Sequence, residues 1–169
     1  MFEKIHPYEI EGNAIKLFKV DSPIVVFGNK ESHNGLTVAW GNLGCLWSKE
    51  MATVFVKPNR YSFEFANKCE YFSIMWFGEL KDSVNKVFGF KSGKDVNKEE
   101  LCNLTPFMLD NAVAYEEAIL IIVCKKIYQK EIDKNNILSK EVLDKPMYKD
   151  GLFHSEYFGE IISVYKKVQ

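Results

Sequence analysis

The segment from Asn34 to Phe77 reads NGLTVAWGNLGCLWSKEMATVFVKPNRYSFEFANKCEYFSIMWF, and it carries the strongest fold signal in the chain. It contains β-branched and aromatic runs that are typical of strands, together with a basic turn and a helix-start signal. This order places small residues, cations and free helix N–H groups close together along the chain. Such a combination can hold a flat aromatic ligand with a phosphate tail. The same residues also suit an ordinary β-barrel interior.

The second half of this segment predicts a strand, a turn, a helix and another strand. Met51 to Lys57 is strongly strand-like, with Val54 and Val56 on one face and Thr53 and Phe55 on the other, and Pro58 ends that strand. Ser62 precedes a Phe-Glu-Phe run and is predicted to cap a short helix that reaches about Asn67. The aromatic run from Tyr71 to Phe77 then returns to a strand.

Further strands and helices are predicted outside the basic turn. The apolar and β-branched residues Ala118 to Cys124 indicate a strand that is covered on both faces. The other predicted strands are Ala14 to Val20, Ile24 to Phe27, Leu36 to Trp40, and Tyr157 to Tyr165 with Gly159 as a bulge or close-approach point. An amphipathic helix over Leu80 to Phe88 is predicted to end at Gly89, a short helical turn precedes Leu101, and Asp133 to Lys145 forms a polar, weakly helical excursion.

Strands dominate this order, and helices do not alternate with them as a parallel α/β sheet requires. We therefore predict a mainly β chain, an antiparallel barrel with peripheral helices, in one domain over residues 1–169.

The bulk composition argues against several functional classes. The 169 residues are 47% hydrophobic and 27% charged, with a formal net charge of −1, so nucleic-acid binding by bulk electrostatics is disfavoured. No window approaches the run of roughly 18 apolar residues that a membrane span needs, and the N-terminus lacks the apolar region of a signal peptide. The four cysteines show no C-x-x-C or metal-ligand spacing. We expect a cytoplasmic protein with reduced thiols, no membrane and no metal.

Small residues recur in the first half of the opening segment. Thr37, Ala39 and Gly41 alternate with Val38 and Trp40, so small side chains share one face. Small side chains let a ring approach the backbone, whose N–H and C=O groups can then bind polar ring edges. The alternative is that they fit a crowded barrel interior, and composition alone favours that alternative.

The turn Lys57-Pro58-Asn59-Arg60-Tyr61-Ser62 has the residues of an anion site. A guanidinium and a hydroxyl at a helix N-terminus both favour a phosphate. Arg60 is the single arginine of the chain, and its fork geometry distinguishes it from a lysine. A plain capping turn with a surface arginine is the alternative.

Taken together, these segments resemble the flavin reductase-like family, the FMN-binding split barrels that include flavoredoxins. The resemblance rests on T-V-A-W-G, on A-T-V-F-V-K-P-N-R-Y-S-F-E-F, and on three later motifs that keep the same order. These later motifs are Ser92-Gly93-Lys94-Asp95-Val96, Leu120-Ile121-Ile122-Val123-Cys124 and His154-Ser155-Glu156-Tyr157-Phe158-Gly159-Glu160-Ile161. The ordered set spans nearly the whole chain, although each piece alone is weak.

The resemblance implies a split β-barrel of antiparallel Greek-key type, a homodimer, and FMN bound without a covalent bond near the subunit interface. Electrons would come from NADH or NADPH and pass to a flavin, a metal complex or a protein acceptor. A flavoredoxin-like electron carrier without NAD(P)H turnover is the alternative. The residues that would line the isoalloxazine are Asn34, Thr37, Val38, Ala39, Trp40 and Gly41, and those that would hold the ribityl phosphate are Arg60, Tyr61 and Ser62, with Lys57 and Asn59 beside them.

Two isolated residues are of interest beside this set. His154 lies in the family's H-x-x-Y-x-G-E pattern, which places it near the flavin or nicotinamide, and an unperturbed imidazole could deliver a proton there. A surface or capping role is the alternative for this histidine. Cys45 follows the small-residue strand and is either a redox thiol or an unreactive cysteine, which the sequence does not decide.

Overall fold

The computed structural model describes residues 1–168. Its strands are β1 (Phe2–Ile5), β2 (Ile24–Gly28), β3 (His33–Thr37), β4 (Gly41–Leu46), β5 (Lys49–Val56), β6 (Tyr71–Trp76), β7 (Pro106–Leu109), β8 (Ala112–Tyr115), β9 (Leu120–Glu131) and β10 (Ser155–Lys167). Its α-helices are α1 (Ala14–Lys19), α2 (Ser62–Lys68), α3 (Lys81–Phe90), α4 (Lys98–Cys102) and α5 (Lys140–Leu143). Short 3₁₀ helices are η1 (Pro7–Glu9), η2 (Gly78–Leu80), η3 (Lys134–Asn136) and η4 (Pro146–Tyr148).

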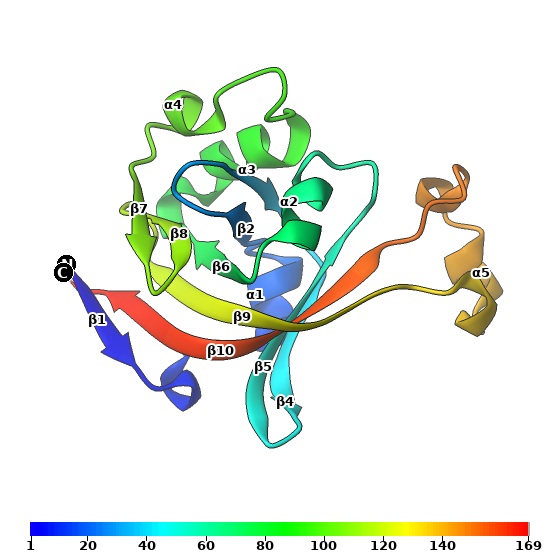
Figure 1. The fold of residues 1–169 in the computed structure, drawn as a ribbon, viewed down its shortest axis with the longest axis horizontal. Coiled ribbons are helices and arrows are strands. Elements are labelled where there is room, and N and C mark those ends of the chain that lie inside the picture. The colour runs from blue at the N-terminus through cyan, green and yellow to red at the C-terminus, as the bar shows by residue number, and fades with distance from the viewer. Residues whose placement is uncertain (169) are drawn as a thin grey trace.

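One antiparallel sheet organises the molecule (Figure 1). Its strand order is β3-β2-β6-β9-β10-β5-β4, and β1 pairs with β10. The hairpin β7-β8 forms a separate two-stranded sheet. Every described strand pair is antiparallel, which confirms the mainly β, antiparallel prediction. The closure of this sheet into a split barrel stays a prediction.

The central strand β9 is covered on both faces, as its continuous apolar sequence predicts. Ile122 and Cys124 belong to a core that includes Phe18 of α1 and Ala66 of α2. The alternate residues of β9 belong to a second core, which α3 and the β7-β8 hairpin cover. Alternation along a strand therefore divides the apolar residues between two cores, one on each face of the sheet.

The prediction of a strand from Ala14 to Val20 is wrong, because these residues form helix α1. The Asn13 side chain accepts hydrogen bonds from the backbone N–H groups of Ile15 and Lys16, which caps the helix. Leu17 and Phe18 pack against the core, while the lysines lie outside it. In so short a helix, the apolar residues and lysines follow one another in an order that resembles the alternation of a strand.

Several boundaries also differ from the predicted ones. Strand β3 ends at Thr37, so Trp40 does not belong to it, and Val38 donates its backbone N–H to Pro23. Helix α3 continues past Gly89 to Phe90. The predicted irregularity at Gly159 is confirmed, because the register with β9 shifts between Phe158 and Gly159. A Cβ at Gly159 would lie 2.6 Å from Cys124 Cβ, so this strand also needs the small residue for close approach.

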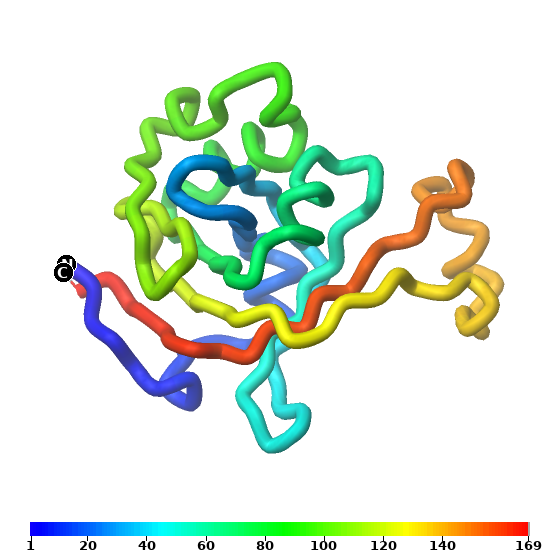
Figure 2. The backbone as a smooth tube through the Cα atoms, viewed as in Figure 1, coloured from blue at the N-terminus to red at the C-terminus, as the bar shows by residue number. Residues whose placement is uncertain are grey.

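The polar excursion between β9 and β10 extends away from the rest of the molecule (Figure 2). It carries η3, α5 and η4, which confirms the weakly helical prediction for this stretch. The first and last strands lie together at the opposite side, where Val168 donates its backbone N–H to Met1. Within residues 1–168, no helix combines the length and the apolar composition that crossing a membrane requires.

Candidate functional site

A cavity lies where the turn after β5 meets strand β3 and the segment after α3. The turn is tight, because Arg60 donates its backbone N–H to Lys57 and Phe63 donates to Arg60. Six of the predicted residues line this cavity together with the backbone of residues 89–93; they are Asn34, Thr37, Asn59, Arg60, Tyr61 and Ser62. The fold therefore brings the predicted phosphate turn next to the start of the small-residue strand.

Asn34 fixes the wall of this cavity. Its side-chain amide donates a hydrogen bond of 2.6 Å to the Ser62 hydroxyl, and both residues are buried. The Ser62 hydroxyl therefore does not cap helix α2, in contrast to the prediction. Tyr61 occupies the cap position and makes no side-chain capping bond. A Cβ at Gly93 would overlap the Asn34 amide oxygen. The backbone of the segment after α3 therefore packs directly against the Asn34 side chain.

Like Lys91, Arg60 is an exposed cation of the cavity. Its guanidinium makes no ion pair with any carboxylate in the part of the chain that the structure describes. An arginine that lines a cavity without an anionic protein partner has its donors available for a phosphate. The environment of Arg60 is what the anion interpretation of the turn requires, and a plain surface arginine would have the same environment.

Lys98 is a buried cation at this cavity, and the sequence prediction missed it. The side chain is 7% exposed, and its ammonium donates to the carbonyl oxygen of Gly35 at 2.9 Å. Burial, followed by the positive charge of Arg60, lowers the pKa of Lys98 to about 8. It forms no ion pair with a carboxylate of residues 1–168. A buried cation beside Arg60 without a carboxylate is a good partner for a bound anion.

Lys57 and His154 form a separate group at the base of the excursion. The Lys57 ammonium pairs with the Asp150 carboxylate at 2.6 Å and also donates to the carbonyl oxygen of Met147. Lys57 is therefore engaged by the excursion rather than free for a phosphate. The rings of Trp40 and His154 have centroids 4.6 Å apart, and neither residue lines the cavity.

The imidazole of His154 is neutral at physiological pH. Burial, followed by the positive charges of Lys57 and Arg60, lowers the pKa of His154 to about 4. Its Nδ1 lies 3.2 Å from the Tyr148 hydroxyl. The imidazolium is thus scarce at neutral pH, so the arrangement does not favour proton donation by a charged His154. A neutral imidazole can still donate or accept one hydrogen bond.

Four of the predicted ring-lining residues do not line the cavity; they are Val38, Ala39, Trp40 and Gly41. Val38 is buried in the core, and Ala39 is exposed between β3 and β4. Gly41 faces inward, where a Cβ would overlap the ring of Phe18. Packing against α1 thus explains why residue 41 is a glycine. This agrees with the alternative in which the small residues fit a crowded interior.

The cysteines and acids give no sign of a metal site. Among residues 1–168, no three His, Cys, Asp or Glu side chains gather as metal ligands would. Cys45 is exposed on β4, while burial raises the pKa of Cys124, so the latter thiol stays protonated.

Comparisons with known proteins identify this fold. No protein-family profile and no curated protein sequence matches the chain. Solved structures do: the FMN-binding domain of a flavin reductase-like enzyme from Shewanella baltica aligns over 98% of this chain and 77% of its own, with a TM-score of 0.64 and 16% identity. This chain has the fold of the flavin reductase-like FMN-binding domains.

Two further solved structures share this fold. The flavoredoxin of Methanosarcina acetivorans is 22% identical over 99% of this chain and 77% of its own, with a TM-score of 0.64. A flavin reductase-type protein from Haemophilus somnus is 14% identical over 89% of this chain and 84% of its own, with a TM-score of 0.65. At these identities the likeness establishes the fold, and the chemistry has to be argued from the chain's own residues.

The residues around the cavity meet the chemical needs of a phosphate-bearing flavin at its phosphate end. Arg60 and Lys98 supply two cations without a carboxylate partner, and Ser62 supplies a positioned hydroxyl. The signal for Lys98 in the sequence is faint: it follows Asn97, which caps α4, and a lysine in a first helical turn is normally solvated.

Proposed function

We propose that this protein binds FMN and acts as an oxidoreductase that accepts electrons from NADH or NADPH and passes them to a flavin, a metal complex or a protein acceptor. The observation that carries the proposal is the cavity where Arg60, Ser62 and Lys98 converge beside Asn34. The shared fold with FMN-binding proteins supports it. FMN itself would supply the hydride chemistry, while the chain binds and orients it.

In this proposal each group of residues has its own role. Arg60, Lys98 and Ser62 hold the phosphate, and Asn34 positions Ser62 through its 2.6 Å hydrogen bond. Asn59, Tyr61 and Thr37 form the rest of that wall. Trp40 and His154 border the ring end, where the neutral imidazole donates or accepts a hydrogen bond rather than carrying charge. Lys57 acts indirectly, because its ion pair with Asp150 fixes the end of the excursion that lies next to the turn.

The proposal also covers the context in which the protein works. We propose one flavin-binding domain over residues 1–169, a sheet closed as a split barrel, a homodimer, and a cytoplasmic location. The four free cysteines support the last of these. Exposed apolar side chains on the excursion, such as Leu138 at 97% exposure, support self-association.

A steady-state assay of NADH and NADPH oxidation, with and without added FMN, tests the reaction. The proposal predicts turnover with one of the two nucleotides that depends on FMN. If the protein binds FMN, turns over neither nucleotide and is reduced by a ferredoxin-like protein, the electron-carrier alternative is correct. A companion variant, His154→Ala, should retain FMN affinity and slow reduction; an unchanged rate would return His154 to a structural role.

A further inference from the structure

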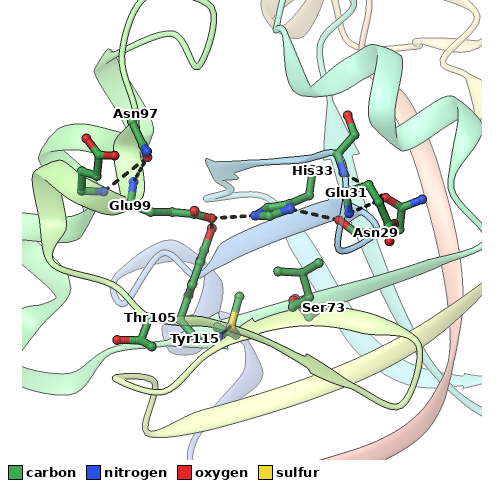
Figure 3. Close-up of polar contacts among 12 residues, drawn as sticks. Asn29, Glu31, His33, Ser73, Asn97, Glu99, Thr105 and Tyr115 are labelled. Atoms are coloured by element: carbon green, nitrogen blue, oxygen red, sulfur yellow. Dashed lines mark hydrogen bonds and ion pairs between the residues drawn. The ribbon is translucent and has the colours of Figure 1, made fainter.

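A network of polar side chains links helix α4 to strand β3 beside the phosphate cavity (Figure 3). His33 Nε2 lies 2.7 Å from a Glu99 carboxylate oxygen, and His33 Nδ1 lies 3.0 Å from the carbonyl oxygen of Asn29. The Tyr115 hydroxyl donates to the same Glu99 oxygen at 2.8 Å. The Glu99 carboxylate is therefore held from two sides, by the first residue of β3 and by the last residue of β8.

The two residues of this ion pair are chain neighbours of residues that form the phosphate cavity. His33 directly precedes Asn34, Glu99 directly follows Lys98, and both Asn34 and Lys98 line that cavity. Two adjacent residues of α4 thus bind β3: Lys98 donates to the carbonyl oxygen of Gly35 at 2.9 Å, and Glu99 pairs with His33. The ion pair therefore holds the same helical turn that brings Lys98 to the cavity.

Helix α4 depends on such contacts for its position. It has five residues, and a helix of this length is not stable by itself. The Asn97 side chain caps its first turn, and Leu104, which follows the helix, is buried in the second core. The cap keeps the helix folded and Leu104 anchors its far end. The side-chain bonds of Lys98 and Glu99 hold its first turn against β3.

The bonds of His33 require its charged form. Both of its partners are acceptors, so both ring nitrogens donate only in the imidazolium. The side chains of His33 and Glu99 are 16% and 22% exposed, so water screens this pair less than a surface pair. The bond to Glu99 outweighs burial and raises the pKa of His33. A neutral His33 has one N–H group for two acceptors, so one of the two bonds is lost.

Glu99 dominates the charge environment of His33. Burial acts to raise the pKa of Glu99, but the bonds from His33 and Tyr115 outweigh it, so the carboxylate is ionised at neutral pH. Burial, followed by the charge of Glu99, raises the pKa of Tyr115 well above its usual range, so its hydroxyl stays protonated. These three side chains line a cavity of about 540 Å³, whose other charged lining residues are Glu31, Lys94, Asp95 and Lys98.

We propose that the His33–Glu99 ion pair positions Lys98 at the phosphate cavity, so that FMN binds more weakly once His33 loses its proton. The inference rests on the proposed FMN phosphate site. Neither His33 nor Glu99 lines that cavity, so both act through Lys98 and not on the ligand. A purely electrostatic role of Glu99 has the opposite sign, because removing a carboxylate near a phosphate strengthens binding.

A double-mutant cycle tests whether Glu99 acts through Lys98. FMN is titrated into the flavin-free protein at a pH below 6.5, where His33 is protonated. Glu99→Ala should weaken FMN binding about fivefold in the otherwise wild-type chain, but by less than about twofold in Lys98→Met. The matched control is Glu100→Ala, which removes an exposed carboxylate from the same helix and should change the affinity in neither background.

The isosteric variant Glu99→Gln tests the role of the His33 proton, and it decides the matter if Glu99→Ala does not fold. The wild type should lose FMN affinity as the pH rises through the His33 midpoint, which an NMR titration of the ring measures and which lies above 6.5. In Glu99→Gln the midpoint and the loss of affinity should both move to lower pH. The further loss that Lys98 causes near pH 8 should stay in place.

Three results would overturn the inference. They are an equal effect of Glu99→Ala with and without Lys98, tighter FMN binding by Glu99→Ala, and a pH profile that Glu99→Gln does not move. FMN binding by the wild type in any of these cases would leave the proposed function standing. A wild type that binds no FMN would remove both.

Discussion

At the residue scale, Lys98 is a buried cation that the folded chain does not neutralise with a carboxylate. Its pKa of about 8 lies below the unfolded value of 10.5, so the folded chain holds this proton less tightly. The free energy of unfolding is therefore reduced below pH 8, and this cost disappears as the pH rises from about 8 to 10.5. A bound phosphate would offset the same cost at neutral pH.

The variant Lys98→Met should therefore separate stability from binding. Without FMN at pH 7, it should be more stable than the wild type by about 1–2 kcal/mol in urea unfolding, because a buried uncompensated charge is removed. The same variant should bind FMN at least about tenfold more weakly. A variant that is less stable and binds FMN normally would show that Lys98 has only a structural role.

His154 gives a second residue-scale prediction, in its titration. The folded pKa of about 4 lies below the unfolded value of 6.5, so the free energy of unfolding falls as the pH drops through that interval. In an NMR titration, the His154 ring signals should shift with a midpoint below 5. Because Lys57 and Arg60 contribute to the lowering, added FMN should raise that midpoint. A midpoint near 6.5 that FMN does not move would contradict the placement of His154 beside the site.

The turn from Lys57 to Ser62 could be located from the sequence, whereas the approach of Lys98 to it could not. Arg60 and Ser62 lie two residues apart at the start of α2, so their chemistry is local. Lys98 reaches the same cavity from α4 through its bond to the Gly35 carbonyl oxygen, beside the contact between Asn34 and Gly93. That contact joins segments that are distant in sequence, and no local pattern encodes it.

At the scale of elements, the start of β4 is shaped by packing against α1. A Cβ at Gly41 would overlap the Phe18 ring, which is 2% exposed, whereas a Cβ at Gly44 of the same strand would meet nothing within 4 Å. Gly41→Ala should therefore lower the free energy of unfolding by about 1–3 kcal/mol, and Gly44→Ala should leave it nearly unchanged. Urea unfolding of both variants is the measurement. If the two variants are equally stable, α1 moves away from β4 at little cost in free energy.

The hairpin β4-β5 shows why some elements were not predicted from the sequence. Leu46 pairs with Lys49, so the connection has two residues, Trp47 and Ser48, both with positive φ angles of 54° and 57°. Such turns normally contain Asn or Gly, and their absence hides the hairpin. By contrast, strands β9 and β5 were predicted directly. The continuous apolar run of β9 reflects burial on both faces, and the β-branched and aromatic residues of β5 are typical of a strand.

At the scale of the whole molecule, the segment between β9 and β10 exposes apolar side chains to solvent in the single chain. Leu138 is 97% exposed, and the segment stands apart from the body in Figure 2. We predict a dimer by sedimentation velocity, weakened at least about tenfold by Leu138→Asp but not by Lys134→Ala on the same excursion. A wild-type monomer at micromolar concentration would contradict the proposed homodimer.

The central claim is that FMN binds with its phosphate at Arg60, and a titration of FMN into the flavin-free protein tests it most directly. We predict saturable binding at one site per chain, weakened at least about tenfold by Arg60→Ala and partly restored by Arg60→Lys, with unfolding free energies within about 0.5 kcal/mol of the wild type. No FMN binding by the wild type, or an Arg60→Ala variant that loses stability and keeps its FMN affinity, would contradict the account.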